Sequence, residues 1–372
     1  MGEGWYKRFI GHHDDVLANC EAQVINQSQN KVSKEGIHIL FWTMTKLMIT
    51  EQLTADRVYN MDETGFQTHE KRRKVVAVRG SKNVWTKSIS ADFHLSLVAA
   101  CSASGHIVPP TFILFGTRVK RDVLNNCAVP GATVTTTESG FINEKIFLQW
   151  INTFSCCIPG TVKRPIVLTF DGYSAHISLD VVTKALEVQI LLVCLPPNAM
   201  HLLQPLDVAV FSTFKKHLRE SIQKCMLSTS ESNIGKAQAI QLASEAWIHG
   251  MLDSNCIAGF KATGLFPPNL VNMTGRFKLF KDGGLKYERK IEWLKFKEEI
   301  CAEVLTLPPP TQKKRRRTTV DVGGRLLTRE LLESLEDEKV QQKKQKKQRQ
   351  PKNRKTNSSS TGTTNEMTVA IV

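Results

Sequence analysis

The sequence has no long run of apolar residues. No stretch approaches the ~18 consecutive apolar residues of a membrane-spanning helix. The first residues also lack the apolar core of a secretory signal peptide. We therefore expect neither a membrane protein nor a secreted one.

Closely paired cysteines are also missing. The nine cysteines contain no Cys-x-x-Cys pair, and their odd number argues against a disulfide framework. The adjacent pair Cys156 and Cys157 lacks zinc-site spacing and is assigned to the core. This usage is typical of reduced intracellular thiols.

Positive charge, by contrast, is abundant and unevenly placed. The 372 residues carry a net charge of +15, and 41% of them are apolar, which is enough for a sizeable core. Residues 311–355 contain sixteen lysines and arginines against six acids, an excess of +10. A partner of opposite charge, such as nucleic acid, is therefore expected.

A buried-strand pattern ends in an aspartate near the middle of the chain. The apolar run 166–170 stops at Asp171 and Gly172. A helical pattern follows over 179–189, and a second apolar strand over 190–195 is stopped by two prolines. An aspartate in this position is held by a rigid element and exposed at the edge of the sheet.

A second aspartate opens the next helical pattern. Asp207 leads into an amphipathic segment at 208–223. The order strand, helix, strand, helix brings Asp171 and Asp207 together, which indicates a metal site.

A third acidic position follows an earlier strand. Residues 57–66 predict a short strand that runs into Asp62 and Glu63. Adjacent side chains of a strand point to opposite faces, so we expect only one of these two acids to face a common site.

The remaining patterns predict an α/β domain with a mixed sheet. Residues 35–53 and 143–158 have helical periodicity, and 94–101 with 107–115 predict a β-hairpin. Pro109 and Pro110 would confine their segment to a sheet edge or a bulge. Helices and strands in this order are typical of layered α/β folds.

Five short sequence motifs occur in a characteristic order along the chain. They are YNMDETGF (59–66), VAACSASG (98–105), LTFDGYSAH (168–176), LPPNAMHLLQPLDVAVFSTFK (195–215) and NCIAGFKATGLFP (255–267). Together they resemble the pogo/Tigger branch of the mariner superfamily of transposases. The resemblance implies a ribonuclease-H-like fold, a mixed sheet flanked by helices, over roughly residues 55–270.

The resemblance also implies catalytic residues. By motif position they are Asp62, Asp171 and Asp207, with 35 residues between the last two. Three such carboxylates can hold two Mg²⁺ or Mn²⁺ ions about 4 Å apart for cleavage and transfer of DNA strands. Composition alone would favour three independent aspartates in turns or helix caps. The five motifs in their characteristic order favour a shared site.

Several basic residues are weaker candidates for DNA contact. His176 could orient a ligand or cap a helix, and Lys215 and Lys216 could meet phosphate or lie on a solvated helix face. Gln204 and Pro205 are interpreted as structural residues of the turn that presents Asp207. The basic run in the tail suits nuclear import or non-specific DNA contact, and its residues are Lys313, Lys314, Arg315, Arg316 and Arg317.

Four segments are expected along the chain. Residues 1–54 read as the remnant of a helix-turn-helix region plus a helical linker, with Trp5 and Phe9 on one helix face. Residues 55–270 form the DDE endonuclease domain, 271–310 a helical extension, and 311–372 a disordered basic tail.

Two classes of function remain open from the sequence. The first is a metal-dependent DNA endonuclease and strand-transfer domain, which the complete aspartate triad favours. The second is a non-catalytic or domesticated nuclear DNA-binding or interaction protein derived from a transposase, which the absent DNA-reading module favours. Both imply DNA as the partner and the nucleus as the location. A homodimer is a candidate assembly, and neither a membrane nor a small-molecule substrate is expected.

Overall fold

The computed structural model describes residues 3–12, 32–65, 94–173, 176–228, 233–282 and 322–335. Contacts divide the chain into one unit at Met1–Arg329 and a second at Glu330–Val372. In the second unit, residues 330–335 are described and are helical. The sheet and the helices that cover it all belong to the first unit.

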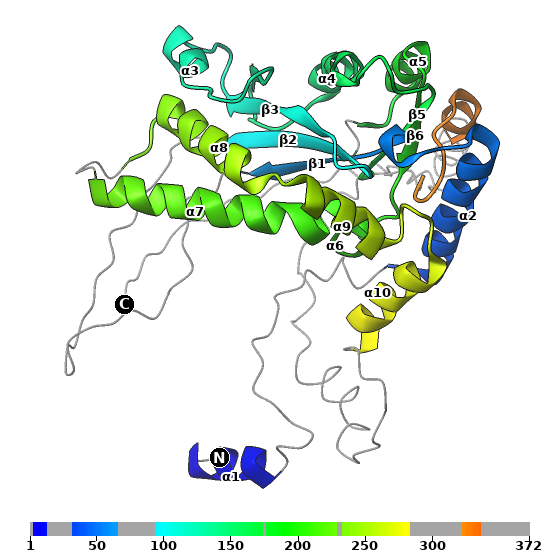
Figure 1. Ribbon diagram of the computed structural model, residues 1–372, viewed down its shortest axis with the longest axis horizontal. Helices are drawn as coiled ribbons and strands as arrows, with labels where there is room; N and C mark the ends of the chain where they lie inside the picture. The colour runs from blue at the N-terminus through cyan, green and yellow to red at the C-terminus, as the bar shows by residue number, and fades with distance from the viewer. Residues whose placement is uncertain are drawn as a thin grey trace, which may run out of the picture. The chain divides into compact units, whose positions relative to one another are not determined.

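Six strands form one mixed sheet in the order β4-β3-β2-β1-β5-β6 (Figure 1). β2 is antiparallel to β1 and β3, and the other neighbouring strands are parallel. The series β3-β2-β1-β5-β6 is the order of a ribonuclease-H-like sheet, so the predicted fold is confirmed. The bounds are β1 Val58–Gly65, β2 Leu95–Ser102, β3 Ile107–Phe115, β4 Thr133–Thr137, β5 Ile166–Phe170 and β6 Ile190–Cys194.

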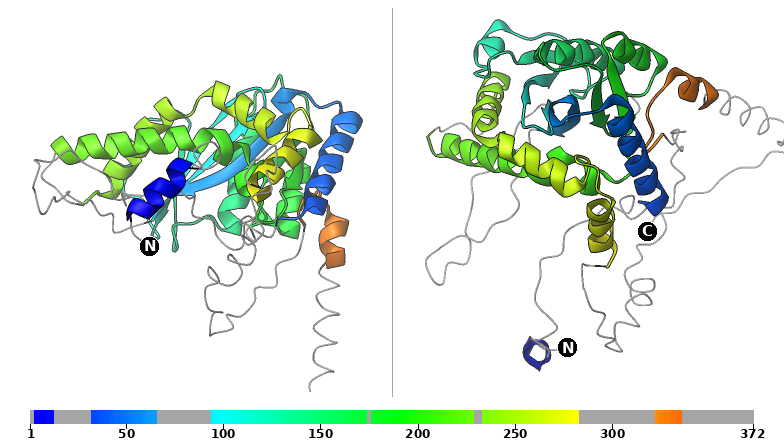
Figure 2. Two further views of the ribbon diagram at one scale, coloured as in Figure 1. Left: turned by 90° about the horizontal axis from the view of Figure 1, so that it is seen from below. Right: turned by 45° about the vertical axis from the view of Figure 1, so that its right-hand side comes forward.

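Helices cover both faces of this sheet. α4 and α5 lie over one face, and α7, α8 and α9 lie over the other (Figure 1, Figure 2). The longer helices are α2 Lys34–Glu51, α4 Glu144–Cys157, α5 Leu179–Glu187, α7 Phe211–Ser228, α8 Lys236–Gly250, α9 Asp253–Thr263 and α10 Leu270–Asp282. The shorter ones are α1 Glu3–His12, η2 Ala55–Arg57, α3 Arg121–Asn125, α6 Met200–Leu203 and the π-helix η4 Leu206–Val210.

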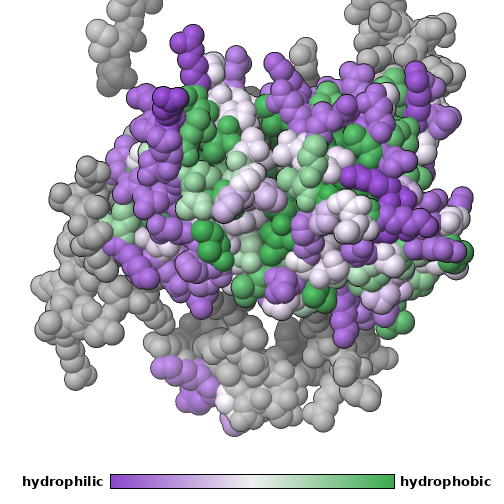
Figure 3. Space-filling model, turned by 45° about the horizontal axis from the view of Figure 1, so that its top comes forward, coloured by the Kyte–Doolittle hydropathy of each residue, from purple (hydrophilic) through white to green (hydrophobic). Residues whose placement is uncertain are grey.

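The side-chain alternation of β1 explains the two layers. Val58 belongs to the core that contains α7–α9, whereas the ring of Tyr59 packs edge-on against Phe154 of α4 at 5.2 Å. On the face shown in Figure 3, hydrophobic side chains are scattered among hydrophilic ones. This mixture is typical of an outer surface, and the continuous apolar contacts lie inside against the sheet.

Polar caps set where three of the helices begin. α2, α4 and α5 each follow a Ser or Asn whose side chain accepts a hydrogen bond from a first-turn backbone N–H. α2 is more than the linker we expected, because Ile37, Leu40 and Met44 are fully buried in the core of the domain. In α1, Trp5 and Phe9 stack at 5.1 Å, as their spacing predicted.

Two features of the β3 side of the sheet follow from unusual sequences. The threonine-rich β4 was not predicted, because it lacks the apolar alternation that marks a strand. Pro109 and Pro110 lie opposite Ala99, where the register of the β2–β3 pairing shifts. Of the two predicted alternatives, a sheet edge and a bulge, the bulge is therefore confirmed. Pairing of β3 with β4 begins only at Thr111, after the prolines.

Residues 322–329 form a strap on the outer strand β6. Leu327 N donates to Leu192 O at 2.8 Å, Gly324 N to Cys194 O at 2.7 Å, and Thr43 Oγ1 of α2 to Gly324 O at 2.7 Å. Our expectation of disorder throughout 311–372 is therefore corrected for this segment. Val322 and Leu327 of the strap are buried. Our expectation rested on the overall composition of the tail and did not consider these two apolar residues. Residues 283–310 of the predicted helical extension and the basic run 313–317 lie outside the described residues.

Arg57 holds the starts of β1 and β5 together. Its buried guanidinium donates to Pro165 O at 2.8 Å and 3.1 Å, and to Glu51 O and Gln52 O at 2.8 Å and 3.2 Å. We predict that Arg57→Met lowers the free energy of unfolding by roughly 2–4 kcal/mol, because four part-buried hydrogen bonds to three carbonyls are lost. Urea denaturation monitored by circular dichroism measures this. An unchanged midpoint would show that the contacts are energetically neutral.

Candidate active site

Asp62 lies on the part of β1 that extends past β5. Pairing with β5 ends at Asn60, so the following residues have no neighbouring strand on that side. Asp62 Oδ1 accepts a hydrogen bond from Glu63 N at 2.8 Å, whereas its buried Oδ2 has no hydrogen-bond partner among the described residues. Burial, joined by the charges of Asp207 and Asp171, raises the pKa of the Asp62 carboxyl well above its usual range.

Asp171 directly follows β5, as the sequence predicted. Its Oδ1 accepts from His176 Nδ1 at 3.0 Å and from Tyr173 N at 3.3 Å. Both donors come from the loop after the strand, so the local sequence fixes the carboxylate at the end of the sheet.

Asp207 lies in the first turn of the π-helix η4. Burial raises the pKa of its carboxyl, the Lys215 ammonium opposes this effect, and the charge of Asp171 adds to it. The preceding turn is tightly packed, because a Cβ on Gly259 of α9 would lie only 2.8 Å from Pro205 O. Glycine at this position lets α9 support the turn directly.

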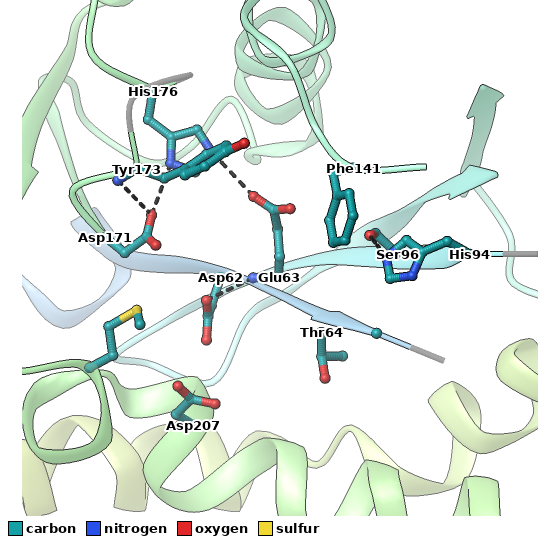
Figure 4. A pocket seen from close by; sticks show the side chains of 12 residues that line it. Asp62, Glu63, Thr64, His94, Ser96, Phe141, Asp171, Tyr173, His176 and Asp207 are labelled. Atoms are coloured by element: carbon teal, nitrogen blue, oxygen red, sulfur yellow. Dashed lines mark hydrogen bonds and ion pairs between the residues drawn. The ribbon is translucent and has the colours of Figure 1, made fainter. Parts of the chain in front are cut away.

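These interactions bring the three predicted aspartates into one pocket of about 500 Å³. Figure 4 shows Asp62 and Asp207 facing each other, with Asp171 above them at the end of β5. The other lining residues are Glu63, Thr64, Gly65, His94, Ser96, Phe141, Tyr173, His176 and Met200. Two of these, Phe141 and Tyr173, present exposed aromatic rings.

His176 joins two carboxylates from opposite sides of its ring. Nδ1 contacts Asp171, and Nε2 forms an ion pair with Glu63 Oε1 at 3.2 Å (Figure 4). Burial tends to lower the pKa of His176, but Asp171 and Glu63 outweigh burial and raise it to about 9. The buried ring directs both nitrogens to carboxylates, and a contact of His176 with DNA stays a prediction.

Glu63 lines the same pocket as Asp62, contrary to our expectation that only one of them would. The two side chains do leave β1 on opposite faces. The strand runs past the end of β5, however, so the pocket reaches around its open side to both faces. The expectation failed because it assumed neighbouring strands on both sides.

The basic candidates differ in their positions. Lys215 is partly buried, and its Nζ lies 5.4 Å from the centroid of the Phe211 ring, near enough to Asp207 to influence its pKa. Lys216 is exposed on α7. The basic run 313–317 lies outside the described residues.

The donor set suits a hard divalent cation. The three aspartates offer carboxylate oxygens, the ligands that Mg²⁺ and Mn²⁺ prefer. The buried Asp62 Oδ2 without a partner is costly unless a cation or a proton satisfies it. Within the described ranges, no three His, Cys, Asp or Glu side chains are already grouped closely enough to hold an ion.

Sequence reasoning missed the roles of several neighbours. Asn60 and Glu63 lie close to Asp62 in the sequence. Phe141 and His94 come from distant segments, and their rings lie 4.0 Å apart, tilted by 33°. For Asn60 the signal was available, since a polar residue among the apolar positions of a strand needs a buried partner. For Phe141 and His94, the sequence carries no signal of their proximity.

Comparison with known proteins supports this architecture at the family level. Residues 94–260 match the family model of the DDE superfamily endonuclease, a range that includes Asp171 and Asp207 and begins after Asp62. Among curated proteins, the MFS-type transporter clz9 of Cochliobolus lunatus is 24% identical over 222 residues. That alignment covers 58% of this chain and 24% of the relative, so the chain spans about a quarter of its length. In the part of the chain that the structure describes, no helix is long and apolar enough to cross a membrane.

Solved structures similar to this chain are mariner transposases. The Mos1 strand transfer complex is 12% identical with a TM-score of 0.44, covering 76% of this chain and 71% of that one. The catalytic domain of Mos1 mariner transposase is 11% identical with a TM-score of 0.32, covering 64% of this chain and 96% of that one. Residues 94–260 are thus similar to the DDE superfamily endonuclease, and the sheet to which they contribute has the ribonuclease-H-like strand order.

Proposed function

We propose that the pocket is the catalytic centre of a pogo/Tigger-like transposase that cleaves DNA strands and joins them to a new site. The observation that carries the proposal is the convergence of Asp62, Asp171 and Asp207 from three different elements. The charges of the other two carboxylates contribute to the raised pKa of Asp62, which supports a shared role for the three.

The proposed chemistry needs divalent ions, which Asp62, Asp171 and Asp207 would hold. Two Mg²⁺ or Mn²⁺ ions, when bound, would activate a water or a 3′-hydroxyl and stabilise the leaving oxygen of a phosphodiester. His176 keeps one oxygen of Asp171 in place and leaves the other for a ligand. Lys215 stands beside Asp207, where an ammonium group would favour an approaching phosphate.

DNA and the nucleus complete the proposal. Phosphate contacts from Lys215 and from the basic run 313–317 would attract any DNA sequence, because such contacts do not read base edges. The same basic run is of the kind that directs nuclear import. We also propose a homodimer as the assembly of this protein.

A cleavage assay tests the proposed chemistry. We predict that the purified chain nicks supercoiled DNA with Mg²⁺ or Mn²⁺, that EDTA stops the reaction, and that Asp171→Asn lowers the rate roughly a thousandfold, because a ligand charge is lost. Asp180→Asn is the matched control, since Asp180 is an exposed aspartate of α5.

The outcomes separate the two functional classes. Nicking that survives in Asp171→Asn would place the activity elsewhere. Metal-independent DNA binding by a parent chain that never nicks would instead favour the domesticated, non-catalytic protein.

A further inference from the structure

A buried amide on β1 connects the chain segments that carry the three aspartates. Asn60 is fully buried, two residues before Asp62, and pairs in register with Thr169, two residues before Asp171. Its Nδ2 donates to Thr169 O at 3.1 Å and to Thr169 Oγ1 at 3.2 Å. The Thr169 hydroxyl in turn donates to Tyr59 O at 3.0 Å.

The same side chain also holds the helix that bears Asp207. Asn60 Oδ1 accepts from Leu206 N at 3.2 Å, at the start of the π-helix η4. The first N–H groups of a helix have no partner within it, so this contact acts as a cap supplied by a distant strand. Asn60 thus uses both ends of its amide, one for each neighbouring element.

Gln204 makes the complementary connection in the opposite direction. Also fully buried, it donates from Nε2 to Met61 O at 3.1 Å, next to Asp62. Its amide also faces Asp62, where it works against the rise in the pKa of that carboxyl. A buried amide that donates to a fixed carbonyl is held in place, because losing that hydrogen bond would leave two desolvated groups.

We propose that Asn60 and Gln204 are positioning residues that set the relative placement of Asp62, Asp171 and Asp207 for divalent cations. Each contact they make lies within two residues of an aspartate. Acting through the backbone, the pair would fix the spacing of carboxylates that carry like charge. This inference rests on the proposed function for the identity of the cation, whereas the connections themselves stand on the geometry.

Mn²⁺ titration calorimetry of the full chain tests the inference. Asn60→Leu and Gln204→Met keep the side-chain volume and remove the amide. Both are expected to raise the Kd for Mn²⁺ at least tenfold at a temperature where the chain is folded. Arg57→Met is the matched control, because it removes a buried hydrogen-bonding group from the turn of helix just before the same strand, at the end away from the pocket. Its Kd should stay within twofold of the parent.

Amide hydrogen exchange provides a readout that needs no metal. In Asn60→Leu we expect faster exchange confined to residues 206–210, whereas Arg57→Met should not produce this local change. Unchanged Mn²⁺ affinity in both amide variants, or equal loss of protection at 206–210 in Arg57→Met, would overturn the inference. A parent chain that binds no Mn²⁺ would refute the proposed function instead, and the exchange pattern would still decide the role of Asn60.

Discussion

Asp62→Asn is expected to abolish metal-dependent DNA cleavage and, at the same time, to raise the melting temperature of the metal-free chain. The first effect, roughly a thousandfold or more in rate, follows from the loss of a ligand charge. The second follows because Asp62 is buried beside two other carboxylates and has one oxygen without a hydrogen-bond partner in the described residues. Neutralising it should stabilise the fold by about 1–2 kcal/mol, or about 2–6 °C.

The stability gain should depend on pH with a definite sign. The pKa of Asp62 is higher in the folded chain than in the unfolded one, so the folded chain binds this proton more tightly. Its destabilising effect is therefore present at high pH and disappears as the pH falls through the folded-state pKa. Melting curves of the parent and Asp62→Asn in EDTA should converge as the pH is lowered from above the folded-state pKa toward the unfolded-state pKa. Curves that stay equally far apart, or a variant that still cleaves, would contradict this account, and Asp180→Asn should change neither property.

Neutralising the basic run 313–317 is the second change with a large expected effect. Replacing Lys313, Lys314, Arg315, Arg316 and Arg317 by Gln should weaken binding to every duplex about equally. It should also reduce the slope of log K against log salt by up to about 4.5, because each of the five lost phosphate contacts contributes about 0.9. Salt titrations on a duplex with the terminal repeat of the proposed pogo/Tigger-like transposable element and on a scrambled duplex measure both quantities. A fluorescent fusion of the same variant should lose its accumulation in nuclei.

A charge-preserving variant is the control for this experiment. Exchanging the lysines of the run for arginines, and the arginines for lysines, keeps its charge and should leave the salt slope unchanged. If the Gln variant lost affinity for the terminal repeat alone, the run would be reading sequence rather than holding phosphate.

The sequence predicted the strands that carry Asp62 and Asp171, because buried β-branched runs with polar ends give a strong local signal. It also placed Asp207 at the start of a helical segment, although the π-helical turn there could not be foreseen. That turn depends on Asn60 and Gly259, which are far away in the chain and reach it only in the folded state. Tertiary contacts of this kind leave no periodic pattern in the sequence.

The pocket was predicted less completely than its aspartates. Alternation along β1 correctly put Asp62 and Glu63 on opposite faces, but it could not show that β5 ends early and opens both faces to one cavity. The double contact of His176 likewise depends on the loop after β5 folding back toward β1. The alternation of side chains along a strand determines which face of the sheet each one points to. The relative lengths of neighbouring strands determine which residues that side chain contacts.

The strap at 322–329 protects an edge that would otherwise invite self-association. β6 is the last strand of the sheet, and its sequence, Ile-Leu-Leu-Val-Cys, is uncharged and strongly β-prone. Exposed strands of this kind pair with other chains and begin aggregation. Gly324 makes the cover possible, since its φ of +74° and its close approach to the α2 backbone both disfavour a side chain. A recombinant fragment that ends before Val322 would keep every aspartate of the pocket and yet leave this strand open to amyloid-like stacking.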